Sequence, residues 1–161
     1  MDTQKLIDQA KKIIKENIYL TLATSSNDGT PWISPLFFAY DNDYNLYWVS
    51  NKNSLHSQLI RNNYRVAIVI FDSSAPEGKG NGVYFDAKAK ELQEEFELNK
   101  AIEILNNRTK IEEFKIKSID GIRGQGVWRI YRAIPFKIYK LTEGKFINDQ
   151  YVDERVEITL K

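Results

Sequence analysis

The chain has no cysteine and a single histidine among its 161 residues. The missing thiols exclude disulfides, cysteine nucleophiles and cysteine-ligated zinc or iron–sulfur centres. With His56 as the lone imidazole, a histidine-rich metal site and most His-dependent catalytic triads are also disfavoured within one subunit. We therefore expect no metal centre in this protein.

The chain also lacks an excess of either charge, since 23 basic residues accompany 22 acidic ones and the two kinds alternate along the sequence. Tight nucleic-acid binding needs a clustered basic surface that displaces counterions from phosphates, so we expect no nucleic-acid partner. No apolar run approaches the roughly 20 residues of a membrane-spanning helix. The first residues, Met1 to Lys5, open into an amphipathic pattern instead of a signal peptide. We expect a cytoplasmic protein with no membrane partner.

Length and composition fit a single domain over residues 1–161, because 42% hydrophobic and 28% charged residues are ordinary values for a chain with a buried core. Apolar residues spaced by three and four predict an N-terminal helix at about 3–17 and a helical insertion at about 94–117. A basic amphipathic helix such as the first one can also lie on a membrane surface. Its apolar face lacks the aromatic residues of interfacial helices, which favours packing on the rest of the domain.

Most of the remaining chain forms short runs rich in strand-forming residues and separated by turn signals, a pattern that predicts antiparallel strands. The expected strands cover residues 19–25, 32–40, 45–50, 65–71, 83–92, 126–133 and 136–141, with one more in the tail. The first three are joined by two short polar turns, which predicts a meander. Residues 65–71 are almost continuously apolar, so we expect that strand to be buried on both faces.

Proline marks two irregular places in these strands. Pro35 lacks a backbone N–H, which assigns its position to an edge, a bulge or an opening in the sheet. Pro135 separates the two closing strands. With about six antiparallel strands and few helices, a small barrel is favoured over a sandwich, because closure removes exposed sheet edges. The expected fold class is mainly β, a six-stranded antiparallel barrel with peripheral helices.

The segment from Ser50 to His56 is the most informative one for chemistry. It joins the end of a strand to a short helix, with Ser54 at the N-cap position. Free backbone N–H groups and hydroxyls at a helix N-terminus suit a phosphate dianion. Lys52 and His56 could add charge-assisted hydrogen bonds. The alternative is that Ser54 only caps its own helix, as serine often does.

Six segments in a fixed order carry a family resemblance. They are Leu-Ala-Thr with Asp-Gly-Thr-Pro (22–31), Ile-Ser-Pro-Leu-Phe-Phe-Ala-Tyr-Asp (33–41), Leu-Tyr-Trp-Val-Ser (46–50), Ser-Leu-His (54–56), Asn-Asn-Tyr-Arg-Val-Ala-Ile-Val-Ile (62–70) and Val-Tyr-Phe-Asp-Ala-Lys-Ala-Lys (83–90). The ordered set resembles the pyridoxamine 5′-phosphate oxidase-like family of FMN-binding split barrels. The resemblance covers about residues 18–92, and the C-terminal strands agree only in type.

The resemblance implies FMN as the cofactor and a homodimer that holds it between two subunits. It places Ser34, Pro35, Leu36 and Phe37 along the isoalloxazine, and Trp48 and Ser50 at the end of the next strand. The phosphate would lie at Ser50, Ser54 and His56, in the loop that also contains Asn51 and Lys52. No residue is assigned a catalytic role.

The chain departs from the family pattern at four positions. Relatives often have Arg or Lys where this chain has Ile33, Phe38 and Leu55, and lysine is usual where it has His56. The predicted phosphate site is therefore less cationic than the family's. We expect a flavin-dependent oxidoreductase. The alternatives are a non-catalytic flavin or haem binding module on the same dimeric barrel, or a barrel that has lost its cofactor.

Overall fold

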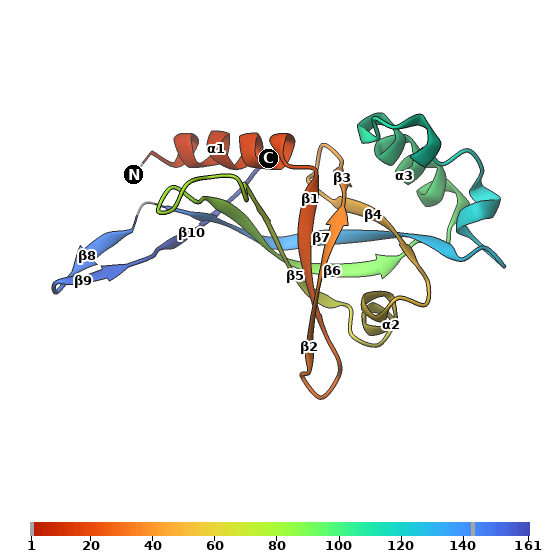
Figure 1. Ribbon diagram of the computed structural model, residues 1–161, viewed down its shortest axis with the longest axis horizontal. Helices are drawn as coiled ribbons and strands as arrows, with labels where there is room; N and C mark the ends of the chain where they lie inside the picture. The colour runs from red at the N-terminus through yellow and green to blue at the C-terminus, as the bar shows by residue number, and fades with distance from the viewer. Residues whose placement is uncertain (1, 143) are drawn as a thin grey trace.

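The computed structural model describes residues 2–142 and 144–161, which form a curled antiparallel sheet with helices around it (Figure 1). The elements, in chain order, are α1 (Thr3–Glu16), β1 (Tyr19–Ser25), β2 (Pro31–Phe37), β3 (Ala39–Tyr40), β4 (Leu46–Asn51), α2 (Leu55–Asn62), β5 (Arg65–Phe71), β6 (Gly82–Glu91), α3 (Glu95–Arg108), the 3₁₀ helices η1 (Glu112–Phe114) and η2 (Ile119–Ile122), β7 (Trp128–Leu141), β8 (Lys145–Ile147), β9 (Gln150–Val152) and β10 (Arg155–Ile158).

The main sheet runs in the order β2-β1-β5-β6-β7-β4-β3, with β10 paired to β7. Every pairing is antiparallel. The first and last strands of this path, β2 and β3, are consecutive in the chain and separated only by Phe38. The sheet therefore has to curl until its two ends meet. The mainly β split barrel expected from the sequence is confirmed, with eight strands in the main sheet instead of six.

The barrel core forms on the concave side of the sheet, where strands alternate inward apolar and outward residues. Leu20, Leu22, Trp48 and Phe85 are each at most 1% exposed and belong to one continuous cluster. Burial of a side chain of this size contributes about 1.5–3 kcal/mol to folding.

Helix α1 covers the concave side where it meets β5, β6, β7 and β10. It begins after Asp2, whose carboxylate accepts a hydrogen bond from the Gln4 N–H at 3.0 Å and caps the helix. Leu6, Ala10 and Ile14 recur every four residues and are its buried positions. The helix is therefore part of the core, as its apolar stripe indicates. None of the described helices is long and apolar enough to cross a membrane.

Helix α3 and the two 3₁₀ helices lie beyond the other end of the sheet (Figure 1) and form a second, smaller core against the outer side of β4. Leu98, Ala101 and Leu105 of α3 pack there with Tyr47. Residues 109–117, the second part of the expected helical insertion, form only the short 3₁₀ helix η1 with irregular backbone on either side of it. Because α3 covers its outer side, β4 has apolar contacts on both faces, as does the neighbouring part of β7, where Ile130 belongs to the second core and Tyr131 to the first.

The expectation that residues 65–71 are buried on both faces is wrong. In β5 the inward Val66, Ile68 and Ile70 are buried, whereas Arg65, Ala67 and Phe71 are exposed. No described element covers the outer side of this strand. Its apolar character therefore reflects an outward apolar surface instead of a second layer of the same chain.

Two other expectations about the strands are modified. The expected meander is present, because β1 pairs with β2 and β3 pairs with β4, but its second strand is interrupted at Phe38 and β4 also pairs with β7. The closing strands are one long strand, β7, which passes through Pro135. The register with β6 shifts between Asp86 and Ala87, so Phe136 is an extra residue on β7. This bulge lets the strand accommodate a proline that cannot donate a hydrogen bond.

Candidate functional site

The structure brings four of the predicted site residues together from β2, β4 and the start of α2. His56 is at the centre of the cluster. Its Nδ1 lies 3.1 Å from Ser34 Oγ, and its Nε2 lies 2.8 Å from Ser50 Oγ and 3.0 Å from Ser54 Oγ. Ser34 thus shares one hydrogen-bonded network with residues that follow it by 16 to 22 positions in the sequence. This is possible because α2 packs against β1 and β2.

Ser54 occupies the N-cap position of α2, as predicted, yet its side chain makes no capping hydrogen bond. Its hydroxyl lies 2.9 Å from the Asn51 carbonyl oxygen and 2.8 Å from Ser57 Oγ. The interpretation that Ser54 only caps its own helix is therefore wrong. The N–H groups of the first helical turn have no intrahelical acceptor. A helix N-terminus of this kind favours a negatively charged ligand.

His56 is only 9% exposed, and burial lowers its pKa below the usual value for histidine. The neutral imidazole is consequently the favoured form near pH 7. In that form one ring nitrogen donates and the other accepts, and serine hydroxyls can serve both. His56 thus contributes hydrogen bonds to the cluster, and not a fixed positive charge.

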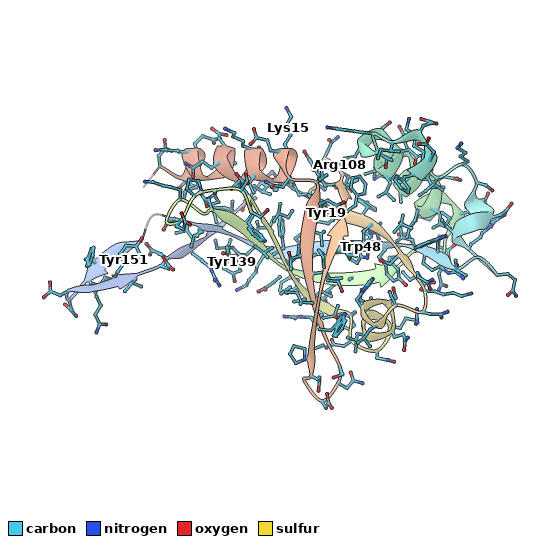
Figure 2. All side chains as sticks on the ribbon, viewed as in Figure 1. Lys15, Tyr19, Trp48, Arg108, Tyr139 and Tyr151 are labelled. Atoms are coloured by element: carbon cyan, nitrogen blue, oxygen red, sulfur yellow. The ribbon has the colours of Figure 1, made fainter. Side chains whose placement is uncertain are left out.

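The other predicted residues lie around this cluster in different environments. Pro35 is exposed, while Leu36 and Phe37 are half-buried. Asn51 accepts a hydrogen bond from the Asn53 N–H at 2.9 Å, which closes the turn before α2. Trp48, labelled in Figure 2, is buried in the barrel core. Its indole stacks on Tyr131, with 5.8 Å between the ring centroids. Trp48 is 0% exposed, so neither its side chain nor its backbone has accessible surface in the single chain.

Strand β2 has a free edge, since it is hydrogen-bonded to β1 alone among the described strands. In an antiparallel pair, part of the backbone N–H and C=O groups of an edge strand point away from the neighbour. Ser34 lies in the middle of this strand and joins it to the His56 cluster. The free edge of β2 is therefore next to the start of α2.

A groove of about 410 Å³ lies on the outer side of the sheet, beside β2. Its lining residues come mainly from β1, β2, β5 and β6, and they are Thr21, Ala23, Ile33, Ala67, Ile68, Val69, Tyr84, Phe85, Asp86, Tyr139 and Arg155. None of the cofactor-binding residues predicted from the sequence lines this groove, although Ile33, which departs from the family pattern, does. The signal that could have found it is the run of small apolar residues at outward positions in strands 19–25 and 65–71.

Comparisons with known proteins give the family and the fold of this chain. The chain matches the family model described as pyridoxamine 5′-phosphate oxidase over residues 6–130. The chain belongs to this family. A UPF0306 protein of Pasteurella multocida is 30% identical over 80 residues, which is 49% of this chain and 53% of that protein. The chain therefore spans about half the length of this curated relative.

Two solved structures show the same fold as this member of the pyridoxamine 5′-phosphate oxidase family. The haem storage protein HutZ of Vibrio cholerae has a TM-score of 0.65 at 22% identity, covering 84% of this chain and 91% of its own. An FAD-binding protein of Mesorhizobium loti has a TM-score of 0.58 at 20% identity, covering 81% and 89%. Proteins that bind a flavin and proteins that bind haem thus share this barrel.

At the three apolar positions where the chain departs from the family pattern, the environments differ. Ile33 and Leu55 are 64% and 45% exposed, so apolar side chains lie at the surface where the resemblance implies cations. Phe38 is fully buried and carries the Arg108 guanidinium 4.6 Å from its ring centroid. Arg108 also donates a hydrogen bond to the Asn17 carbonyl oxygen at 2.6 Å. Arg108 therefore stabilises the fold and does not belong to the surface site.

Proposed function

We propose that this chain is a flavoprotein that binds FMN and acts as a flavin-dependent oxidoreductase. The observation that carries the proposal is the free edge of β2 between an apolar groove and the uncapped N-terminus of α2. A flavin has three parts with matching needs. Its ring edge needs backbone donors and acceptors, its ring face needs an apolar surface, and its phosphate needs N–H groups and hydroxyls.

The residues present fit FMN in these three respects. Backbone groups from Ser34 to Phe37 would hold the edge of the isoalloxazine, with Ile33 against its face. The first turn of α2 and the Ser54 hydroxyl would hold the phosphate, with Lys52 in the same loop. When bound, FMN supplies the redox chemistry. The chain orients the ring, excludes water from one of its faces and balances part of the phosphate charge.

The same proposal includes a homodimer. The groove opens on an outer sheet surface that carries exposed Tyr19, Ile33 and Phe71, at 58%, 64% and 45% exposure. An apolar surface of this kind on a single chain is typical of a protein–protein interface. Pairing two copies through it would enclose the groove and place the flavin between subunits.

The haem alternative receives less support from the residues. A haem iron takes an axial ligand such as histidine, methionine or tyrosine. His56, the only histidine, is buried, and both of its ring nitrogens lie within hydrogen-bond distance of serine hydroxyls. Binding iron would break these bonds. We therefore expect no Soret shift that depends on His56 when the protein is titrated with haem.

A comparison of FMN with riboflavin tests the phosphate part of the site. The two ligands share the ring and ribityl chain and differ only in the phosphate. Fluorescence titration should give at least a tenfold lower Kd for FMN, because a phosphate that accepts hydrogen bonds from helix N–H groups gains about 1.5–3 kcal/mol. Equal Kd values would show that the protein does not recognise the phosphate.

Leu55→Arg should tighten FMN binding about tenfold. The exposed Leu55 is the first residue of α2, at a position where the family resemblance implies a cation. An arginine there can pair with the phosphate and forms stronger, charge-assisted hydrogen bonds. Leu55→Glu should weaken binding by a similar factor through repulsion. FMN fluorescence quenching measures both.

Asn62→Arg at the other end of α2 is the matched control for Leu55→Arg, since it adds the same charge to the same helix. Its Kd for FMN should stay within about twofold of the wild type, as an exposed charge more than a Debye length away is largely screened. If the two arginine variants bind FMN alike, the phosphate is not at the start of α2.

A further inference from the structure

The hairpin β8–β9 extends from the end of the sheet, away from the barrel and from α1 (Figure 1). Its two strands pair only with each other, with Phe146 opposite Tyr151. These two rings form an edge-to-face pair at 5.5 Å, yet Phe146 is 74% and Tyr151 is 61% exposed. Ile147 and Val152 are exposed as well. The hairpin thus presents apolar side chains on both of its faces.

A hairpin of this size is not expected to be stable without contacts to another surface. A single two-stranded hairpin is marginal in water, and this one has three residues in each strand. Asn148 and Asp149 form its turn with φ of 49° and 62°, so the turn chemistry favours the hairpin. The aromatic pair of the hairpin is not buried, because no described element of the chain covers it.

The hairpin is continuous with the groove described above. Val152 ends β9, and Arg155, three residues later, begins β10 and lines the groove. Arg155 is held in place by Tyr84, over whose ring its guanidinium lies at 4.3 Å. The hairpin therefore starts at the rim of the outer sheet surface that the proposed homodimer buries.

Charge on the two surfaces is complementary. Asp149 and Asp153 are exposed carboxylates in the turn of the hairpin and just after β9. On the outer sheet surface, Arg65 and Lys88 are directly opposite each other on β5 and β6, and neither has an ion-pair partner among residues 2–142 and 144–161. Like charges opposite one another are unfavourable. A nearby acidic segment would relieve this repulsion.

We propose that the β8–β9 hairpin is an arm that lies on the outer sheet surface of a second copy of this chain, where Phe146 and Tyr151 cover the partner's groove. This inference rests on the homodimer in the proposed function. Each subunit then contributes aromatic side chains to the flavin site of the other. The acidic residues of the arm lie towards the partner's Arg65 and Lys88.

The absence of cysteine makes a direct test available. Chains of two different tag lengths are co-expressed, one with Tyr151→Cys in the arm and the other with Ala67→Cys or Asp86→Cys in the groove. After mild oxidation, the mixed-size disulfide dimer should form with at least one groove position. Phe114→Cys is the matched control, because Phe114 is 73% exposed but lies in the helical insertion. It should give at least tenfold less mixed dimer.

Light scattering on the wild-type chain separates this inference from the proposed function. A dimer in solution without any arm-to-groove disulfide overturns the arm and leaves the dimer intact. A monomer at all concentrations overturns both the arm and the dimer. The flavin-binding part of the proposed function is tested separately, by the absorption spectrum of the protein. In a dimer that uses the arm, Phe146→Ser with Tyr151→Ser should raise the dimer dissociation constant at least tenfold, and Phe114→Ser should leave it unchanged.

Discussion

The double variant Ser54→Ala, His56→Ala is expected to weaken FMN binding by roughly 2–4 kcal/mol, on the order of a 30- to 700-fold higher Kd. Both side chains belong to the network that joins β2, β4 and the start of α2. Ser54 would lose a hydroxyl that faces the phosphate. His56 would lose the bonds that hold Ser34 and Ser50 in position. Titration of the variant with FMN, followed by flavin fluorescence, measures the change.

Folding has to be separated from binding in this variant, because His56 and its partners are buried. Asn62→Ala, at the far end of α2, is the control for a change in the same helix. His56→Gln retains hydrogen-bonding groups and should recover part of the affinity. If the double variant keeps the far-UV circular dichroism of the wild type and an unchanged Kd, the phosphate site has been misplaced.

Lys140→Met is expected to stabilise the protein at pH 7 by up to about 3 kcal/mol. Lys140 is fully buried in β7, and burial lowers its pKa to about 8. Its ammonium group donates hydrogen bonds to the Asn81 side-chain oxygen and to the Leu141 carbonyl oxygen, and no carboxylate pairs with it among the described residues. A methionine of similar length fills the same space without a buried charge.

The pH dependence of this stabilisation has a definite sign. The pKa of Lys140 is lower in the folded chain than in the unfolded chain, so the folded state loses its proton first as the pH rises. The cost of burying the charge is complete below about pH 8 and disappears towards the unfolded pKa of about 10.4. The difference in unfolding free energy between Lys140→Met and wild type should therefore shrink from pH 8 to pH 10.

Urea unfolding at several pH values measures this difference. Lys137→Met in the same strand is the control, because that side chain is 48% exposed and should change stability by less than about 0.5 kcal/mol. A difference that stays constant from pH 7 to pH 10 would contradict a buried ammonium group at Lys140.

Elements with local signals could be predicted from the sequence. The apolar spacing gave α1 within one residue of its observed end, because helix periodicity and the Asp2 cap are both local. The turn at Asp28 and Gly29, where Gly29 has φ of 89°, places β1 against β2 in the expected hairpin. The pairing of β4 with β7 joins segments about eighty residues apart. No local pattern specifies such a partner, so the sequence predicted the pairing of β4 with the strand just before it but not its pairing with β7.

The candidate site was predictable in part. The order of strand end, serine-rich turn and helix start located Ser50, Ser54 and His56, and the structure adds that Ser34 joins them. The burial of His56 could not be predicted, since a lone histidine near a helix start is compatible with either environment. The outer groove could not be predicted from the sequence either. A continuous apolar run is compatible both with a strand that its own chain covers and with a strand whose outer side contacts another molecule.

The absorption spectrum of the freshly purified protein, with mass identification of the released cofactor, tests the central claim most directly. The account predicts the two flavin absorption bands and a stoichiometric amount of FMN, or full binding of FMN added to the apoprotein. A folded, colourless protein that neither contains a flavin nor binds added FMN would contradict it.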